Sequence, residues 1–199
     1  MSLYGKENKE AWQTFSDEVQ ASYINNGFMK SDRVELKFNT WKIVLDTYSE
    51  NGGNALAYTR IRSSIVNPDG FKFKIYRKGI LSNVFKLFGT QNIPIGDTIF
   101  DNTFIVKSNS VSRIKVLLSN TRIKDLLIGF PYVELSIKGE EGAWGQETQK
   151  GTGELRLIYP YGIIKDINVL KNLFELFKET LTTLLSLNII TDKEKKDTI

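Results

Sequence analysis

The sequence contains no cysteine and no histidine. Without cysteine, neither a disulfide nor a cysteine-ligated zinc or iron–sulfur site can form. Catalytic triads and dyads that use histidine as the base are excluded, as are cysteine nucleophiles and histidine pH switches. Any chemistry must therefore depend on carboxylates, lysine, arginine, tyrosine, serine or threonine.

Long hydrophobic runs and phosphate-binding loops are also missing. The most apolar stretch, Ile163 to Ile190, is interrupted by six charged side chains, whereas a membrane span needs about 20 mostly apolar residues. No glycine-rich loop has the spacing of a nucleotide-binding motif, which argues against ordinary nucleotide-dependent catalysis. The first 25 residues lack the apolar core of a signal peptide. We therefore predict a cytoplasmic protein without a transmembrane segment or a cofactor.

Neither sign of charge dominates. The 27 basic and 23 acidic side chains give a net charge of +4, spread over both halves of the chain. This balance permits an anionic partner without demanding one. The sequence leaves open whether the partner is an anionic molecule or another protein.

The 199 residues, 41% of them apolar, supply enough material for a sizeable core. No internal repeat, linker or composition break divides the chain. The sequence therefore predicts a single α+β domain over residues 1–190. Residues 191–199 carry three basic and three acidic side chains and are predicted to be a disordered tail.

The spacing of apolar residues along the chain predicts the helices and strands. Between residues 9 and 25, apolar side chains recur every three or four positions, which predicts a helix closed by Gly27. From Arg33 the period is two, and turn sequences such as Asn51 to Asn54 separate the runs. The strands predicted from this alternation are Arg33 to Phe38, Trp41 to Tyr48, Ala55 to Ile65 and Phe71 to Lys78.

After Gly79 the predicted elements are mixed. Further strands are predicted at Phe100 to Lys107, Tyr132 to Ile137 and Glu154 to Tyr159, and helices at Ile80 to Phe88, after Ser110, after Asn120 and from Asp166 to about Asn188. Gly139 to Gly153 holds five glycines and predicts a mobile loop. The order favours an α+β fold: an antiparallel meander of about four strands plus two or three others, packed against an N-terminal helix and a long C-terminal helix.

If the apolar rows of the meander pack inward, its outer face is rich in basic and tyrosine side chains. Such a face could bind single-stranded nucleic acid, anionic lipid or another partner. The alternative is a solvated face whose lysines discourage edge pairing. The candidate contact residues are Lys37, Lys42, Tyr58, Arg60, Arg62, Lys72, Lys74, Tyr76 and Lys78.

Three groups of carboxylates are weaker candidates. Asp97 and Asp101 beside Gly96 could ligate a cation, but the run lacks the repeated acidic spacing and central glycine of a calcium loop, which favours loop capping. Glu140 and Glu141 could divide acid and base roles, although neighbouring carboxylates in a loop are usually solvated. Glu134 and Glu154 could project from a sheet, but no spacing brings them together. No metal site is predicted, and the catalytic residues are unknown.

The predicted C-terminal helix has a wide apolar face. Leucines and phenylalanines from Leu170 to Leu187 would lie across the sheet as the main core element. A long helix on a curved antiparallel sheet also describes proteins that enclose hydrophobic ligands. A packed core and a ligand cavity are therefore both open at this point.

Several motifs resemble a family of uncharacterised bacterial proteins, a domain of unknown function. The resemblance covers roughly residues 10–188 and implies a bacterial, single-domain, soluble protein, with no activity or site to transfer. The stretches that carry it are WKIVLDTY from Trp41, YTRIR from Tyr58, FKFKIYRKG from Phe71 and FGTQNIPIGDTIFDNTFIVKSN from Phe88.

The absence of any recognisable catalytic spacing favours a non-enzymatic binding or interaction module. The alternative is a carrier of a hydrophobic or lipid-like ligand held between the sheet and the C-terminal helix. A carboxylate-based enzyme is the third hypothesis.

Overall fold

A computed structural model describes residues 3–25, 32–49, 57–79, 91–130, 132–139 and 151–192. These residues form eight strands and five helices. The strands are β1 (Ser22–Ile24), β2 (Arg33–Phe38), β3 (Trp41–Tyr48), β4 (Tyr58–Val66), β5 (Phe73–Arg77), β6 (Phe104–Ser108), β7 (Glu134–Lys138) and β8 (Thr152–Tyr159). The helices are α1 (Leu3–Glu18), α2 (Thr98–Thr103), α3 (Val111–Leu117), α4 (Thr121–Gly129) and α5 (Ile167–Ser186).

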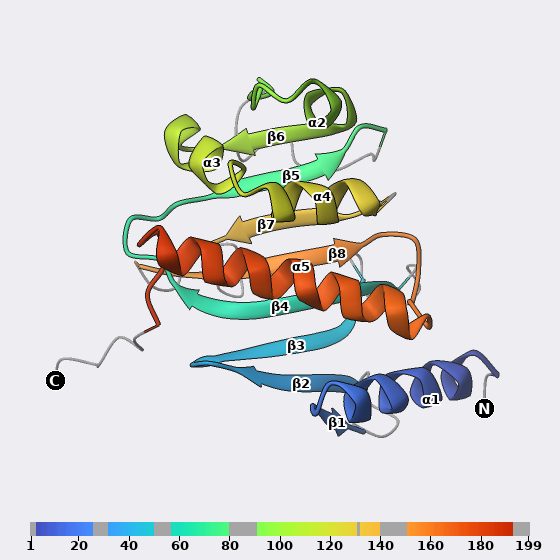
Figure 1. The fold of residues 1–199 in the computed structure, drawn as a ribbon. Coiled ribbons are helices and arrows are strands. Elements are labelled where there is room, and N and C mark those ends of the chain that lie inside the picture. The colour runs from blue at the N-terminus through green and yellow to red at the C-terminus, as the bar shows by residue number, and fades with distance from the viewer. Residues whose placement is uncertain are drawn as a thin grey trace, which may run out of the picture.

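All eight strands belong to one antiparallel sheet in the order β1-β2-β3-β4-β8-β7-β5-β6. Together with the long C-terminal helix, this sheet confirms the predicted α+β class. The first four strands form a meander. The next two, β5 and β6, lie at the opposite edge of the sheet, and β7 and β8 fill the space between β5 and β4 (Figure 1).

One member of the predicted meander lies elsewhere. The strand predicted at Phe71 to Lys78 is β5, but its hydrogen-bonded neighbours are β6 and β7 rather than β4. Two later strands, β8 and β7, separate it from β4. Alternation reports which face a side chain occupies but not which strand lies alongside, so the neighbour was predicted wrongly.

Helices α1, α4 and α5 lie across the same face of the sheet, with α5 passing over β4 and β8 (Figure 1). Its side chains Leu173, Phe177 and Leu181 are fully buried in one hydrophobic cluster with sheet residues such as Ile61 and Leu157. The indole of Trp12 on α1 donates to the carbonyl of Ile164 at 3.0 Å. The centre of the helix–sheet interface is thus a close-packed core.

The N-terminal helix ends earlier than its periodicity predicted. Residues 22–24 form β1 instead, in register with Arg33 to Glu35 of β2. Gln20 has a left-handed backbone with φ of 56°, and the amide of Ala21 returns to the carbonyl of Ser16 at 2.8 Å. A left-handed residue terminates a helix, so the apolar residues beyond it continue as a strand.

The strand predicted at Phe100 to Lys107 is in fact a short helix followed by a strand. Asp97 caps α2 by accepting from the amide of Phe100 at 3.1 Å. Phe100 and Phe104 lie four residues apart, and their buried rings stack with centroids 4.7 Å apart. This spacing is that of one helical turn, and β6 begins only at Phe104.

The last helices follow the prediction closely. Ser110, Asn120 and Asp166 are the N-caps of α3, α4 and α5. The helix predicted over residues 80–88, most of the glycine-rich loop and most of the predicted tail lie outside the described residues. Within the described residues, none of the helices has the length and apolar character required to cross a bilayer.

The outer edge of β6 is occupied by the segment that precedes α2. The amide of Ile93 donates to the carbonyl of Val106 at 2.9 Å. The amide of Val106 donates to the side-chain oxygen of Asn92 at 2.7 Å. Asn92 and Ile93 therefore hydrogen-bond to the backbone amide and carbonyl of Val106, which a further strand would otherwise use.

Candidate functional site

The sheet face opposite the helices carries the charged strand residues and is called the polar face below. Register places Val44 opposite Arg62 and Asp46 opposite Arg60, while Ile43, Leu45 and Ile61 between them are buried under the helices. The apolar rows of β3 and β4 thus pack inward, which is the condition on which the outer face was inferred. Lys72 and Lys78 flank β5 rather than belonging to it.

Arginines of the polar face are held by carboxylates. Arg60 forms two hydrogen bonds to Asp46, both 2.8 Å, and its guanidinium lies 4.9 Å from the ring centroid of Tyr48. Arg62 pairs with Asp46 at 2.9 Å and with Glu154 at 3.3 Å. Burial alone would lower the pKa of Arg62, but the charges and hydrogen bonds of the two carboxylates outweigh it and raise that pKa.

Lysines of the same face differ in burial. Lys74 is buried and pairs with Glu134 at 2.7 Å, and its ammonium lies 5.6 Å from the ring centroid of Tyr76. Lys42 is exposed and lies 3.5 Å from Glu35. The remaining predicted contact residues are dispersed: Lys37 is exposed opposite Lys42, Tyr58 lies opposite Tyr48, Lys72 precedes β5, and Lys78 donates to the carbonyl of Asp101 at 2.9 Å.

The inserted strands divide the predicted contact residues into two groups. Residues on β2, β3 and β4 lie on one side of β8 and β7, and those of β5 lie on the other. Glu154 and Glu134, whose neighbours no sequence spacing revealed, occupy the intervening strands and pair with Arg62 and Lys74. These carboxylates reduce the free positive charge of the face, and its role in binding a partner stays a prediction.

Asp97 and Asp101 organise the loop before α2. Both carboxylate oxygens of Asp101 accept backbone amides, from Ile95 at 2.8 Å and Gly96 at 2.9 Å. Asp97 pairs with Lys124 of α4 at 2.6 Å, and this hydrogen bond, with that from Phe100, lowers the pKa of Asp97. Among the described residues, no three or more aspartates and glutamates are grouped so that they could hold a metal ion.

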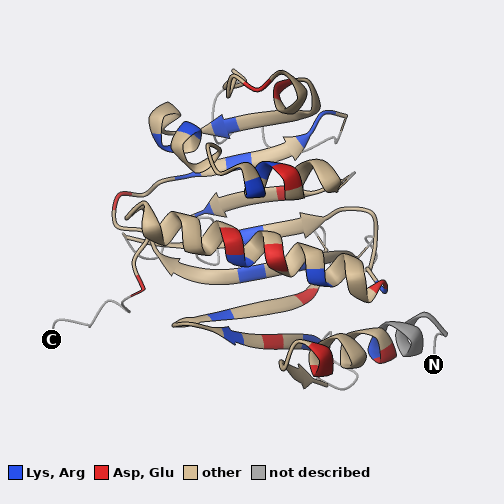
Figure 2. Cartoon of the chain, in the orientation of Figure 1, with Lys and Arg blue, Asp and Glu red and all other residues tan. Residues whose placement is uncertain are grey.

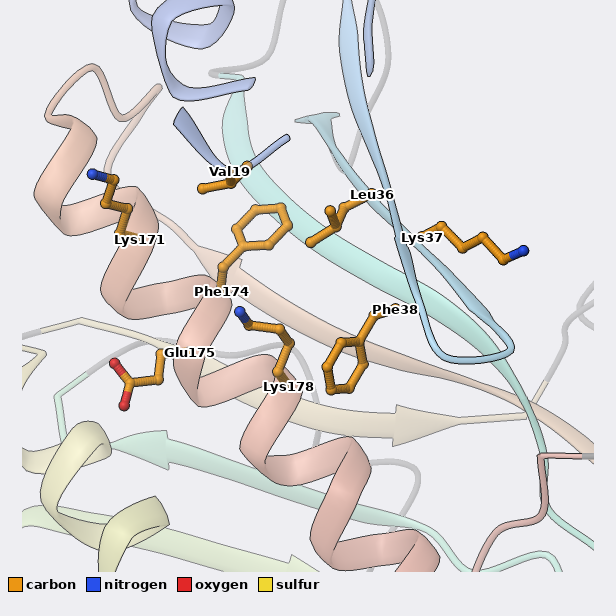
Figure 3. Close-up of a pocket in the computed structure, with 8 residues that line it drawn as sticks. All are labelled: Val19, Leu36, Lys37, Phe38, Lys171, Phe174, Glu175 and Lys178. Atoms are coloured by element: carbon orange, nitrogen blue, oxygen red, sulfur yellow. The ribbon is translucent and has the colours of Figure 1, made fainter. Parts of the chain in front are cut away.

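A groove of about 440 Å³ lies where α5 passes β2 and the end of α1. Its floor is made by Val19, Leu36, Phe38 and Phe174, whose side chains point toward a common space in Figure 3. Val19, Leu36 and Phe38 are each only partly buried. The groove therefore exposes apolar surface from three elements that are distant in sequence.

Lysines border this apolar floor. The ammonium of Lys178 lies 5.9 Å from the ring centroid of Phe38 and reaches between the rings of Phe38 and Phe174 (Figure 3). Lys171, one turn before Phe174, forms an ion pair with Glu18 of α1. Lys37 also lines the groove, but its side chain points away from it, as does that of Glu175 (Figure 3).

Two other hollows are lined by described residues. One of about 610 Å³ is lined by polar side chains of α1, including Glu10 and Asp17, and by Tyr23. Burial and a hydrogen bond to Asp32 raise the pKa of Tyr23. Another, of about 240 Å³, lies between α3 and the end of α5. The second also joins apolar residues, Val116, Leu187 and Ile189, to a basic one, but it has about half the volume of the groove and its Arg113 is paired with Asp69.

Comparison with known proteins relates the fold to one solved structure. The crystal structure of the mycobacterial trehalose monomycolate transport factor A, TtfA, matches with a TM-score of 0.53 over 89% of this chain and 94% of that chain. The two proteins share a fold. Their sequences are 8% identical, so the likeness extends to the fold alone.

Sequence comparison adds no further assignment. No protein-family model matches the chain, and no curated protein matches it in sequence. The resemblance to uncharacterised bacterial proteins noted in the sequence analysis therefore stays a prediction.

The groove residues on α5 were not singled out from the sequence. Phe174 was assigned to the core, and Lys171 and Lys178 were noted only as charges interrupting an apolar run. Their spacing of three and four residues places them on one side of a helix, which was the available signal. Their meeting with Leu36 and Phe38 depends on the packing of α5 across the sheet, which the sequence pattern does not contain.

Proposed function

We propose that the protein binds a lipid-like amphiphile with an anionic head group in the groove between α5 and β2. The observation that carries this proposal is the placement of the Lys178 ammonium beside the ring of Phe38, in a groove whose floor combines the partly exposed Leu36 and Phe38 with the buried Phe174. The protein would act as a non-enzymatic binding module or carrier.

The two parts of the groove suit the two parts of such a ligand. Binding removes apolar surface of the floor and of an acyl chain from water at the same time, which contributes about 0.8 kcal/mol per buried methylene. An ammonium beside the floor can pair with a carboxylate or phosphate at the end of that chain. A volume near 440 Å³ lies within the usual range for small-molecule sites.

The structural neighbour supports the same ligand class. TtfA is described as a transport factor for trehalose monomycolate, and its fold matches most of this chain. The centre of the helix–sheet interface is close-packed here, with Leu173, Phe177 and Leu181 fully buried. The ligand would therefore lie along the margin of the interface rather than within it.

A chain-length series tests the proposal. Saturated fatty acids from eight to sixteen carbons would be titrated into the protein by calorimetry, alongside the matching primary alcohols. Because one methylene contributes about 0.8 kcal/mol, we expect the Kd to fall about fourfold per added carbon until the groove is filled. The acids should bind more tightly than the alcohols by about fivefold, as expected for one partly exposed ion pair.

Variants of the groove residues test where the ligand binds. Phe38→Ala and Leu36→Gln should weaken every member of the series at least tenfold, while Lys178→Gln should weaken the acids and leave the alcohols unchanged. Lys37→Gln is the matched control, because Lys37 lies next to Phe38 with its side chain directed away from the groove (Figure 3). Equal binding by the wild type and both floor variants would refute the proposed site.

A further inference from the structure

The ammonium of Lys178 in the groove forms no ion pair with a carboxylate of the described residues. It lies beside the ring of Phe38, a contact that leaves its charge in place. Side chains three or four residues apart on a helix are neighbours. Those around Lys178 are Phe174, Glu175, Leu181 and Thr182. Glu175 is therefore the one acidic neighbour at this spacing that α5 itself offers to the ammonium.

Helix α4 holds this carboxylate away from Lys178. Arg122, in the first turn of α4, donates to Glu175 and forms an ion pair with it. That hydrogen bond and the charge of the same carboxylate raise the pKa of Arg122. The side chain of Glu175 accordingly points away from the groove (Figure 3).

The other acidic residue close to Lys178 in sequence is also bound by α4. Asn120, the N-cap of α4, donates to Glu179 at 2.7 Å. Figure 2 shows acidic and basic residues following one another along α5. Contacts with α4 thus decide which charges of α5 are available to the groove.

If Arg122 were removed, Glu175 would have two lysines of α5 within reach. Lys171 lies four residues before it and already pairs with Glu18 of α1. Lys178 lies three residues after it, and the order with the acidic residue first is the favourable one on a helix. The released carboxylate would therefore pair with Lys178 and neutralise the cation of the groove.

We propose that Arg122 determines the head-group specificity of the groove by holding Glu175 on α4, which keeps the ammonium of Lys178 available to an anionic head group. Arg122 acts through Glu175 and is a positioning residue, since it is not among the residues that line the groove. The inference rests on the proposed function, because it requires that an acidic amphiphile binds beside Lys178. It predicts an effect on the head group and none on the acyl chain.

Calorimetric titration with dodecanoic acid and dodecanol tests this role. Arg122→Gln should bind the acid about twofold more weakly than the wild type does, the effect of one helical ion pair formed at Lys178. It should bind the alcohol as tightly as the wild type does. Arg122→Lys should retain the wild-type preference for the acid, since a lysine can still pair with Glu175. Lys115→Gln is the control for net charge, because it removes an exposed cation from α3.

A second substitution separates this role from a structural one. Adding Glu175→Gln to Arg122→Gln should restore acid binding, because no carboxylate is then left to pair with Lys178. If Arg122 merely fastened α4 to α5, the double variant would lack that link as well and would not recover.

The outcomes distinguish this inference from the proposed function. A wild type that binds neither compound would refute both. A wild type that prefers the acid, together with an Arg122→Gln variant of unchanged preference, would overturn the role of Arg122 alone. Equal weakening of acid and alcohol, or no recovery in the double variant, would overturn it as well.

Discussion

At the scale of single residues, carboxylates in this protein serve structure in ways that resemble ligand sites in the sequence. Asp101 holds two consecutive backbone amides with its two oxygens. Asp97 caps α2 and reaches Lys124 on another helix. Paired aspartates beside a glycine have the composition of a cation site, but here their lone pairs are directed to amides and an ammonium. Only the partners, which come from outside the motif, distinguish the two uses.

The ion pair of Asp97 predicts a pH-dependent stability. The hydrogen bond from Lys124 lowers the pKa of Asp97 below its ordinary value of 3.8. The contribution of the carboxylate is therefore complete above that ordinary value and is lost as the pH falls through the lower pKa of the folded state. We expect Asp97→Asn, which keeps an N-cap, to be less stable than the wild type at pH 6, with a difference that shrinks below pH 4.

Urea unfolding at several pH values would measure that difference. Asp125→Asn is the control, because Asp125 is an exposed carboxylate next to Lys124 on α4. A difference that stays constant down to pH 3 would show that the ion pair does not stabilise the fold.

At the scale of elements, the helix caps divide into local and tertiary ones. Asp166 accepts two amides of α5, at 2.8 and 3.1 Å. Asn120 accepts the amide of Ile123 and also donates to Glu179 and Thr183 of α5, at 2.7 and 2.9 Å. One asparagine thus begins α4 and fastens it to α5.

This difference predicts unequal costs for removing the two caps. Loss of a cap costs about 1 kcal/mol, so Asp166→Ala should lower the free energy of unfolding by that amount. Asn120→Ala also removes two hydrogen bonds between helices, each contributing about 1 kcal/mol, and should cost about 3 kcal/mol. Chemical denaturation of the two variants gives the comparison. Equal losses would mean that the bonds to α5 contribute nothing.

Elements were more predictable than their neighbours. Alternation identified the residues of β2 and β3, and cap residues located α3, α4 and α5, because both signals are local. The helical spacing of Phe100 and Phe104 was misinterpreted as a strand, since a short apolar run suits either structure. The neighbour of β4 could not be predicted, because β8 follows it by about ninety residues and pairs through backbone groups common to all residues.

At the scale of the whole molecule, the sheet is completed by strands that arrive late in the chain. β8 pairs with β4 on one side and β7 on the other, and α5 covers it. The centre of the sheet is thus completed by β7 and β8, while β1 is a three-residue strand at the margin. The groove follows from the same arrangement, since it lies where α5 passes β2 and the end of α1.

Hydrogen exchange should reproduce this arrangement. We expect the amides of β4, β8 and β7 to exchange most slowly, because their opening requires disruption of the core. Those of β1 should exchange faster by several orders of magnitude. Native-state exchange followed by NMR or mass spectrometry would test this. Comparable protection in β1 and β8 would contradict the expected order.

The pairing of Asn92 and Ile93 with β6 bears on how copies of the protein can associate. Sheets polymerise when each copy offers one free edge to the next and keeps another for the one after it. Here the edge at β6 already has Asn92 and Ile93 in the positions of an incoming strand. A strand added at β6 would have to displace both residues, which disfavours growth of a filament through this edge.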